Sequence, residues 1–64
     1  MKSLEYIGGN IYALIGYDEN GYETHILSVE VERGKIPFIC SYVPSQVSKE
    51  NLNTMLELIF EIQK

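Results

Sequence analysis

Residues 11–43, IYALIGYDENGYETHILSVEVERGKIPFICSYV, decide the fold of this 64-residue chain. Apolar and polar residues alternate along much of this stretch, which is typical of half-buried strands. Two glycine-containing pairs, Asn20-Gly21 and Arg33-Gly34, interrupt the alternation. An Asn-Gly pair favours a type I′ turn, because that turn needs a positive φ at both central residues. The stretch therefore predicts three antiparallel strands, over residues 11–17, 22–32 and 36–43.

Two-residue turns also fix which residues face each other across the strands. The pairs expected around the two turns are apolar or aromatic: Leu14–Leu27, Tyr12–Val29, Val31–Ile36, Val29–Phe38 and Leu27–Cys40. All of these side chains fall on the same face of the sheet, whereas a slip of one residue would scatter them over both faces. This face is therefore predicted to be the core face.

Residues 3–7 predict a further strand in front of this stretch. A three-residue loop, Gly8-Gly9-Asn10, joins it to the strand 11–17 and needs a positive φ at Asn10 or at a glycine. A loop of this length adds Leu4 and Tyr6 to the core face. Pro37 lacks the N–H that a central strand would donate, so the strand 36–43 is expected at an edge of the sheet.

A helix is expected after Ser48, a good N-cap residue with apolar residues at the hydrophobic-staple positions on either side of it. Five residues form the stripe predicted to pack on the sheet: Leu52, Met55, Leu56, Ile59 and Ile62. Leu58 and Phe60 lie at opposite borders of the apolar arc. The sequence thus predicts a single α+β domain over residues 1–64. In it, an antiparallel four-stranded β-meander (β-β-β-β-α) carries one C-terminal amphipathic helix on one sheet face.

Composition narrows the classes of partner. Five basic and nine acidic residues give a net charge of −4, whereas direct nucleic-acid binding needs clustered Lys and Arg. The acidic residues instead fit a protein partner with a basic surface. No apolar run reaches the roughly 18 residues of a membrane span, and no signal-peptide pattern is present. With a single cysteine, a cytoplasmic location is the expectation. A chain this short buries only about 60% of its unfolded surface, so we expect a homodimer.

No residue pattern in the chain predicts catalysis, a metal site or a cofactor. His25 and Cys40, the only residues of their kinds, are expected beneath the helix, with His25 hydrogen-bonded to Tyr42 at the edge of the core. In that position they could not serve as an activated nucleophile pair, which must be reachable by substrate. The acidic residues between 18 and 23 surround a tight turn, which cannot wrap a cation as a calcium loop does.

Two kinds of surface are candidates for binding a partner. On the face away from the helix, Ile15, Ile26 and Ile39 are expected to form a contiguous apolar strip, which a free monomer rarely leaves in water. Aromatic residues near the hairpin tip and apolar residues at the borders of the helical arc complete the predicted partner-binding set: Tyr17, Tyr22, Leu58 and Phe60.

These features favour a small non-enzymatic protein-interaction module, homodimeric, that binds and modulates or inhibits another macromolecule. An inhibitor of a host enzyme or defence system, encoded by a phage or mobile element, would suit the small size and the acidity. The alternative is a small-ligand-binding protein or accessory subunit. Its pocket would lie between protomers and be lined by Tyr12, His25 and Tyr42, because such sites favour aromatic walls with few polar groups.

Overall fold

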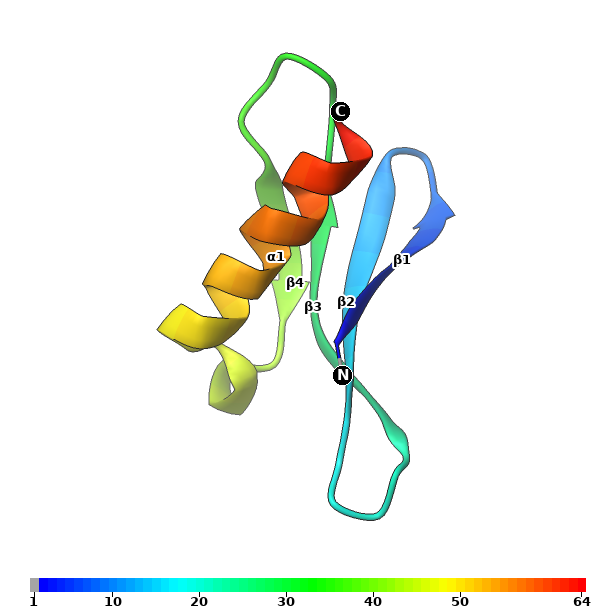
Figure 1. Ribbon diagram of the computed structural model, residues 1–64, viewed down its shortest axis with the longest axis vertical. Helices are drawn as coiled ribbons and strands as arrows, with labels where there is room; N and C mark the ends of the chain where they lie inside the picture. Colours follow the sequence, from blue (N-terminus) through cyan, green and yellow to red (C-terminus); the bar gives the residue numbers. More distant parts are fainter. Residues whose placement is uncertain (1) are drawn as a thin grey trace.

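The structure, a computed structural model, describes residues 2–64. Four strands are followed by a short 3-10 helix and one α-helix (Figure 1): β1 (Ser3–Gly8), β2 (Ile11–Tyr17), β3 (Glu23–Glu30), β4 (Phe38–Tyr42), η1 (Pro44–Gln46) and α1 (Lys49–Ile62). The strands form one antiparallel sheet in the order β1-β2-β3-β4. The predicted α+β meander with a C-terminal helix on the sheet is confirmed.

The core lies between α1 and the sheet. Both central strands contribute four consecutive buried residues, whereas no residue of β4 is buried. The buried cluster comes from β2, β3, the residue after β3 and the helix: Leu14, Ile26, Leu27, Val29, Val31, Met55 and Ile59. Leu4 and Tyr12 pack against it, as the predicted core face requires.

The loop between β1 and β2 contains a type I′ turn, which the sequence predicts at Asn20-Gly21 instead. Gly9 and Asn10 both have a positive φ, of 55° and 68°, which this turn requires. Gly8 pairs with Ile11, and the register shifts by one residue between Tyr6 and Gly8. A two-residue turn plus a bulge therefore takes the place of the expected three-residue loop. Tyr6 still faces Tyr12, with 5.2 Å between the ring centroids.

The predicted type I′ turn at Asn20-Gly21 is wrong. Asn20 has a negative φ, and Gly21 alone takes the left-handed conformation, with φ 84°. The Gly21 N–H donates to the Asp18 carbonyl (3.0 Å), and the Asp18 N–H donates to the Tyr22 carbonyl (2.9 Å). This is a three-residue loop with a glycine bulge. The Asp18 side chain selects it, because its Oδ1 accepts from the N–H groups of Asn20 (2.9 Å) and Tyr22 (3.0 Å).

A bulge in β3 corrects the register that this longer loop would otherwise shift. Ile15 faces His25, but Leu14 faces Leu27, so Ile26 is an extra residue on β3. The longer loop and the bulge each shift the register by one residue, in opposite directions. The predicted pairs Leu14–Leu27 and Tyr12–Val29 are therefore confirmed. Ile26 is 2% exposed and belongs to the core. Its predicted place in an outer apolar strip is wrong, because the bulge brings it into the core beside Leu27.

The pairing predicted between β3 and β4 is also wrong. Leu27 faces Tyr42 rather than Cys40, and Val29 faces Ile39 rather than Phe38. A turn does form at Arg33-Gly34, with the Lys35 N–H on the Glu32 carbonyl (3.1 Å). Only Gly34 has a positive φ there (81°), and a turn of that kind splays the flanking strands. Pairing resumes only after Pro37, so Val31 and Ile36 do not meet.

The helix begins where the sequence predicts. The Ser48 hydroxyl accepts from the Asn51 N–H (3.1 Å), and the buried Asn51 amide donates to the Gln46 carbonyl (2.6 Å). The stripe that meets the sheet is rotated from the predicted one. Met55 and Ile59 are buried and Leu58 packs on the core, whereas Leu56 is 51% exposed.

Replacing Ile26 with Val tests the bulge. We expect a loss of about 0.5–1.5 kcal/mol in unfolding free energy, because one buried methylene is removed from a packed site. Ile36→Val is the matched control, since Ile36 is 92% exposed and the same change there should cost almost nothing. Chemical denaturation followed by circular dichroism measures both. Equal effects would contradict the position of Ile26 in the core.

Candidate interaction surfaces

The two residues with the most reactive side chains are not in the core. Cys40 is a free, exposed cysteine whose Sγ lies 3.7 Å from the Phe38 carbonyl oxygen. His25 is exposed and faces Ile15 on the sheet face away from α1, while Tyr42 faces Leu27 on the face towards α1. Their predicted burial, and the predicted His25–Tyr42 pairing, are therefore wrong. The cause is the pair of register shifts in β3 and β4, which the turn residues do not reveal.

The predicted outer apolar strip does not form. Ile15 does lie on the outer face but is only 8% exposed, and Ile26 belongs to the core. Ile39 faces Val29 and lines a hollow with Leu52, so it lies on the helix side of the sheet. The middle of the outer face instead carries small side chains, with the Ser28 and Ser41 hydroxyls 2.6 Å apart.

An uncovered apolar surface extends from a groove beside β4 along one flank of the helix. It consists of Ile39, Tyr42, Val47, Leu52, Leu56 and Phe60, and we refer to it as the β4–α1 surface. The first four line an open groove of about 320 Å³. Phe60 is 74% exposed and Tyr42 59%. Large apolar side chains gathered in this way typically mark a place where another molecule binds.

The rotation of the helix explains why this surface is open. Leu52, Leu56 and Phe60 follow one another at four-residue spacing, so they lie along one flank of α1. Leu52 is the member of this row that reaches the groove beside β4. On the other flank, Ile62 lines a hollow with Tyr12 of β2, and α1 contacts β1. The helix therefore contacts β1 at one side of the sheet, while a groove remains between Leu52 and the β4 residues Ile39 and Tyr42 at the other.

The outer edge of β4 is also free to form hydrogen bonds. The Val43 N–H donates to the Ile26 carbonyl (3.0 Å), towards β3. Because successive residues of a strand direct their backbone groups to alternate sides, the N–H and C=O of Tyr42 point away from the sheet. The segment from Ile36 to Ser48 contains no charged residue. A free edge without charges is a ready template for another strand.

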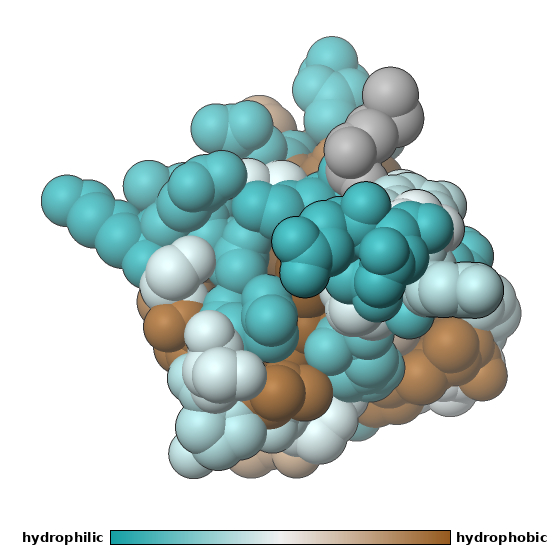
Figure 2. All heavy atoms as spheres, turned by 90° about the horizontal axis from the view of Figure 1, so that it is seen from below, coloured by the Kyte–Doolittle hydropathy of each residue, from teal (hydrophilic) through white to brown (hydrophobic). Residues whose placement is uncertain are grey.

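The hairpin between β2 and β3 forms a second candidate surface. The pairing of β1 with β2 ends at Ile15. The pairing of β4 with β3 ends at Leu27, with one further hydrogen bond from the Val43 N–H to the Ile26 carbonyl. Residues 16–25 therefore project as a two-stranded arm, seen at the bottom of Figure 1. Tyr17 (52% exposed) and Tyr22 (72% exposed) lie near its tip. The segment 17–23 holds three acidic residues and no basic one. Viewed from that end, the molecule is mostly hydrophilic, with apolar side chains in patches towards one side (Figure 2).

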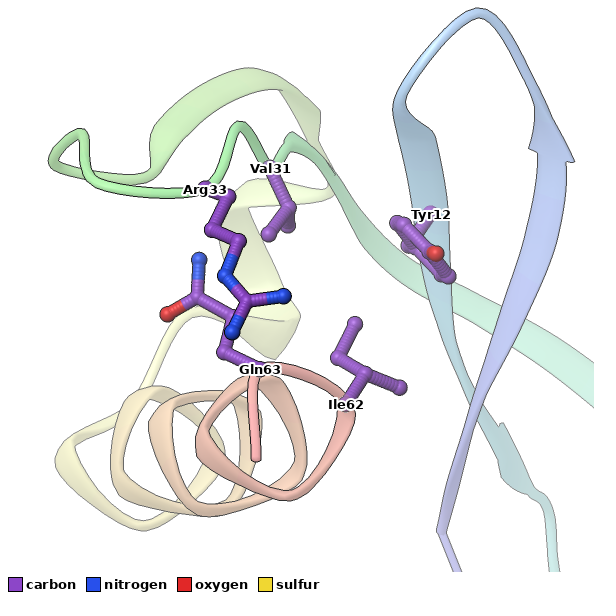
Figure 3. Close-up of a pocket in the computed structure, with 5 residues that line it drawn as sticks. All are labelled: Tyr12, Val31, Arg33, Ile62 and Gln63. Atoms are coloured by element: carbon purple, nitrogen blue, oxygen red, sulfur yellow. The ribbon is translucent and has the colours of Figure 1, made fainter.

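The three residues of the predicted ligand pocket are not brought together. Tyr12 lines a hollow of about 160 Å³ at the C-terminal end of α1, together with Val31, Arg33, Ile62 and Gln63 (Figure 3). Tyr42 lines the groove beside β4 instead, and His25 lies on the opposite face of the sheet. Within residues 2–64 there is also no group of three His, Cys, Asp or Glu side chains that could hold a metal ion.

Four of the seven residues in the predicted partner-binding set are exposed in the structure. Tyr17, Tyr22, Ile39 and Phe60 are exposed, whereas Leu58 packs on the core. Val47 and Leu56 were not predicted as surface residues. One signal could have found them: the uncharged run from Ile36 to Ser48, which lies between Lys35 and Lys49 in a chain where 22% of the residues are charged.

Comparisons with models of protein families, with curated proteins and with solved structures found no match to this chain. In the described part of the chain, no helix has the length and apolar character needed to cross a membrane.

Removing the Asp18 side chain tests how the arm is held. We expect Asp18→Ala to lower the unfolding free energy by about 1 kcal/mol, because two N–H groups lose their acceptor at an exposed turn. Glu19→Ala is the control, since it removes a carboxylate from the same turn that accepts neither bond. Thermal unfolding compares the two variants. An equal change in both would show that charge, rather than these hydrogen bonds, governs the turn.

Proposed function

We propose that this chain is a non-enzymatic protein-interaction module that binds, and thereby modulates or inhibits, another macromolecule. One observation carries the proposal: the β4–α1 surface leaves large apolar side chains in water beside a free strand edge. Covering apolar surface gains roughly 25 cal/mol per Å². The aromatic members of the surface therefore supply a substantial driving force for binding.

The chemistry of this surface fits a protein partner better than a small molecule. The groove is open and has apolar walls, whereas a small-molecule site usually encloses its ligand and adds a few placed polar groups. A strand added to the β4 edge would gain backbone hydrogen bonds, while its side chains would pack on Tyr42 and Leu56. Peptide recognition by strand addition works in this way.

The arm supports a second contact, with a basic macromolecular partner. It projects away from the core and has tyrosines beside its carboxylates. Tyrosine supplies a large contact area at low entropic cost, and the surrounding negative charge speeds the approach of a basic surface. An inhibitor of a host enzyme or defence system, encoded by a phage or mobile element, is one role that such a module would fill.

The double variant Leu56→Glu/Phe60→Glu tests the proposed function. Both residues are exposed, so we expect the unfolding free energy to change by no more than about 0.5 kcal/mol for each substitution. Binding through the β4–α1 surface should be lost, because the variant places two charges in it. The measurement is quantitative mass spectrometry of proteins captured from a native extract, followed by direct titration of each purified candidate.

The matched control is Ile7→Glu, which changes an equally exposed residue (61%) on β1, at the other edge of the sheet. A Tyr17→Ser/Tyr22→Ser variant tests the arm in the same experiment. A partner lost with one surface variant and kept with the control would support the proposal. If titration gives the same affinity for the wild type and both surface variants, the proposed function is wrong.

A further inference from the structure

We propose that the β4–α1 surface binds a second copy of this chain, by antiparallel pairing of β4 with the β4 of its partner. This inference rests on the proposed function, since it names the occupant of the same surface. The two four-stranded sheets would join into one eight-stranded sheet. The open flanks of the two α1 helices would then lie on the same side of it, facing each other across the two-fold axis.

The two edges of the sheet differ in a way that selects β4 for this pairing. β1 carries Glu5 at its centre and a bulge next to Gly8, whose φ is 113°. An edge charge and a bulge both discourage the addition of another strand. β4 also has a bulge, because Cys40 is an extra residue between Ile39, which faces Val29, and Ser41, which faces Ser28. It carries no charged residue, however, and Tyr42 directs its free N–H and C=O away from the sheet.

Charge favours a second copy over a basic partner at this surface. Each chain has a net charge of −4, so two copies repel each other least where the acidic residues are absent. The run from Ile36 to Ser48 meets this condition. A basic partner would find no carboxylate within that run, and the acidic arm is the better surface for it. In a two-fold dimer the same patch is used twice, so an uncharged patch brings no like charges together.

The available area is in the range that a dimer needs. The chain exposes 4694 Å², about 500 Å² more than folded monomers of this mass expose on average. Tyr42 and Phe60, the aromatic residues of the β4–α1 surface, are 59% and 74% exposed. Together they offer roughly 270 Å² of aromatic surface. A standard interface takes about 800 Å² from each partner, so these two residues supply about a third before any aliphatic side chain is counted.

Two prolines limit the pairing to a closed dimer. Pro37 precedes β4 and Pro44 follows it by two residues. Neither has an N–H to donate, so the paired segment is confined to about residues 38–43. Once the β4 edges are joined, only the β1 edges remain, and these carry the charge and the bulge. The assembly therefore closes at two copies rather than continuing as a fibre.

The pairing places the only cysteine next to its counterpart. Cys40 is the middle residue of β4 and is exposed. When two copies of the segment 38–43 pair antiparallel along their full length, Cys40, the bulged residue of β4, lies within one residue of the two-fold axis. The two Cys40 Cα atoms would then be about 5–8 Å apart. A short bismaleimide can join thiols at that separation.

The first test is the solution mass of the full chain, measured by light scattering during size-exclusion chromatography over a range of concentrations. The proposal predicts twice the 7.3 kDa of one chain. Cys40→Lys should raise the dissociation constant at least about tenfold, because it sets two like charges beside the axis. Ile7→Lys, on β1, should leave the constant unchanged. A wild-type mass of one chain at every concentration would overturn the proposal.

Cross-linking with a short bismaleimide provides a second test that does not depend on how well the lysine variant folds. The wild-type protein should yield a covalent dimer through Cys40 at micromolar concentration. The control is Cys40→Ser/Glu5→Cys, which moves the thiol to the β1 edge, away from the proposed interface, and should give no covalent dimer. Equal cross-linking of both proteins would overturn the β4 pairing. A monomeric wild type that still binds a different protein through Leu56 and Phe60 would overturn this inference while supporting the proposed function.

Discussion

The extra residue at Ile26 is the constraint on which the rest of the structure depends. The loop at the end of the arm is one residue longer than a two-residue turn, and this alone would move every later residue of β3 to the opposite face. The bulge at Ile26 reverses the shift before the strand reaches the core. Leu27 and Val29 then meet Leu14 and Tyr12 beneath the helix, and Ile26 itself is buried among them.

Much of the architecture follows from patterns that the sequence contains in full. The alternation along β2 and β3, the Ser48 cap and the apolar spacing of the helix predict the meander, the central register and the start of α1. The bulges in the strands and the loop at Asn20-Gly21 do not follow from those patterns. Asn20-Gly21 has the ideal composition for a type I′ turn, yet the Asp18 carboxylate stabilises a longer loop, and periodicity cannot show which residue of a strand is bulged.

The same local departures decide which residues are available for binding. The bulges move Ile26 into the core, place Ile39 on the helix side, and leave Cys40 and His25 exposed. The helix contacts β1 and leaves a groove beside β4, so the apolar residues that line this groove lie on the helix side of the sheet rather than on its outer face. β1 and β4 are both edge strands, and β4 is the one without a charged residue. If a second copy covers the β4 edge, the two acidic arms remain free for a third molecule.

Amide hydrogen exchange at Tyr42 tests this account most directly. Its N–H points away from β3, while the neighbouring Val43 N–H is bonded to Ile26. In an isolated chain Tyr42 should exchange at the rate of an unprotected amide. Pairing of β4 with a second strand would protect it, so the account predicts that its exchange slows as the protein concentration rises. Rapid exchange of Tyr42 at every concentration, with Val43 protected throughout, would contradict it.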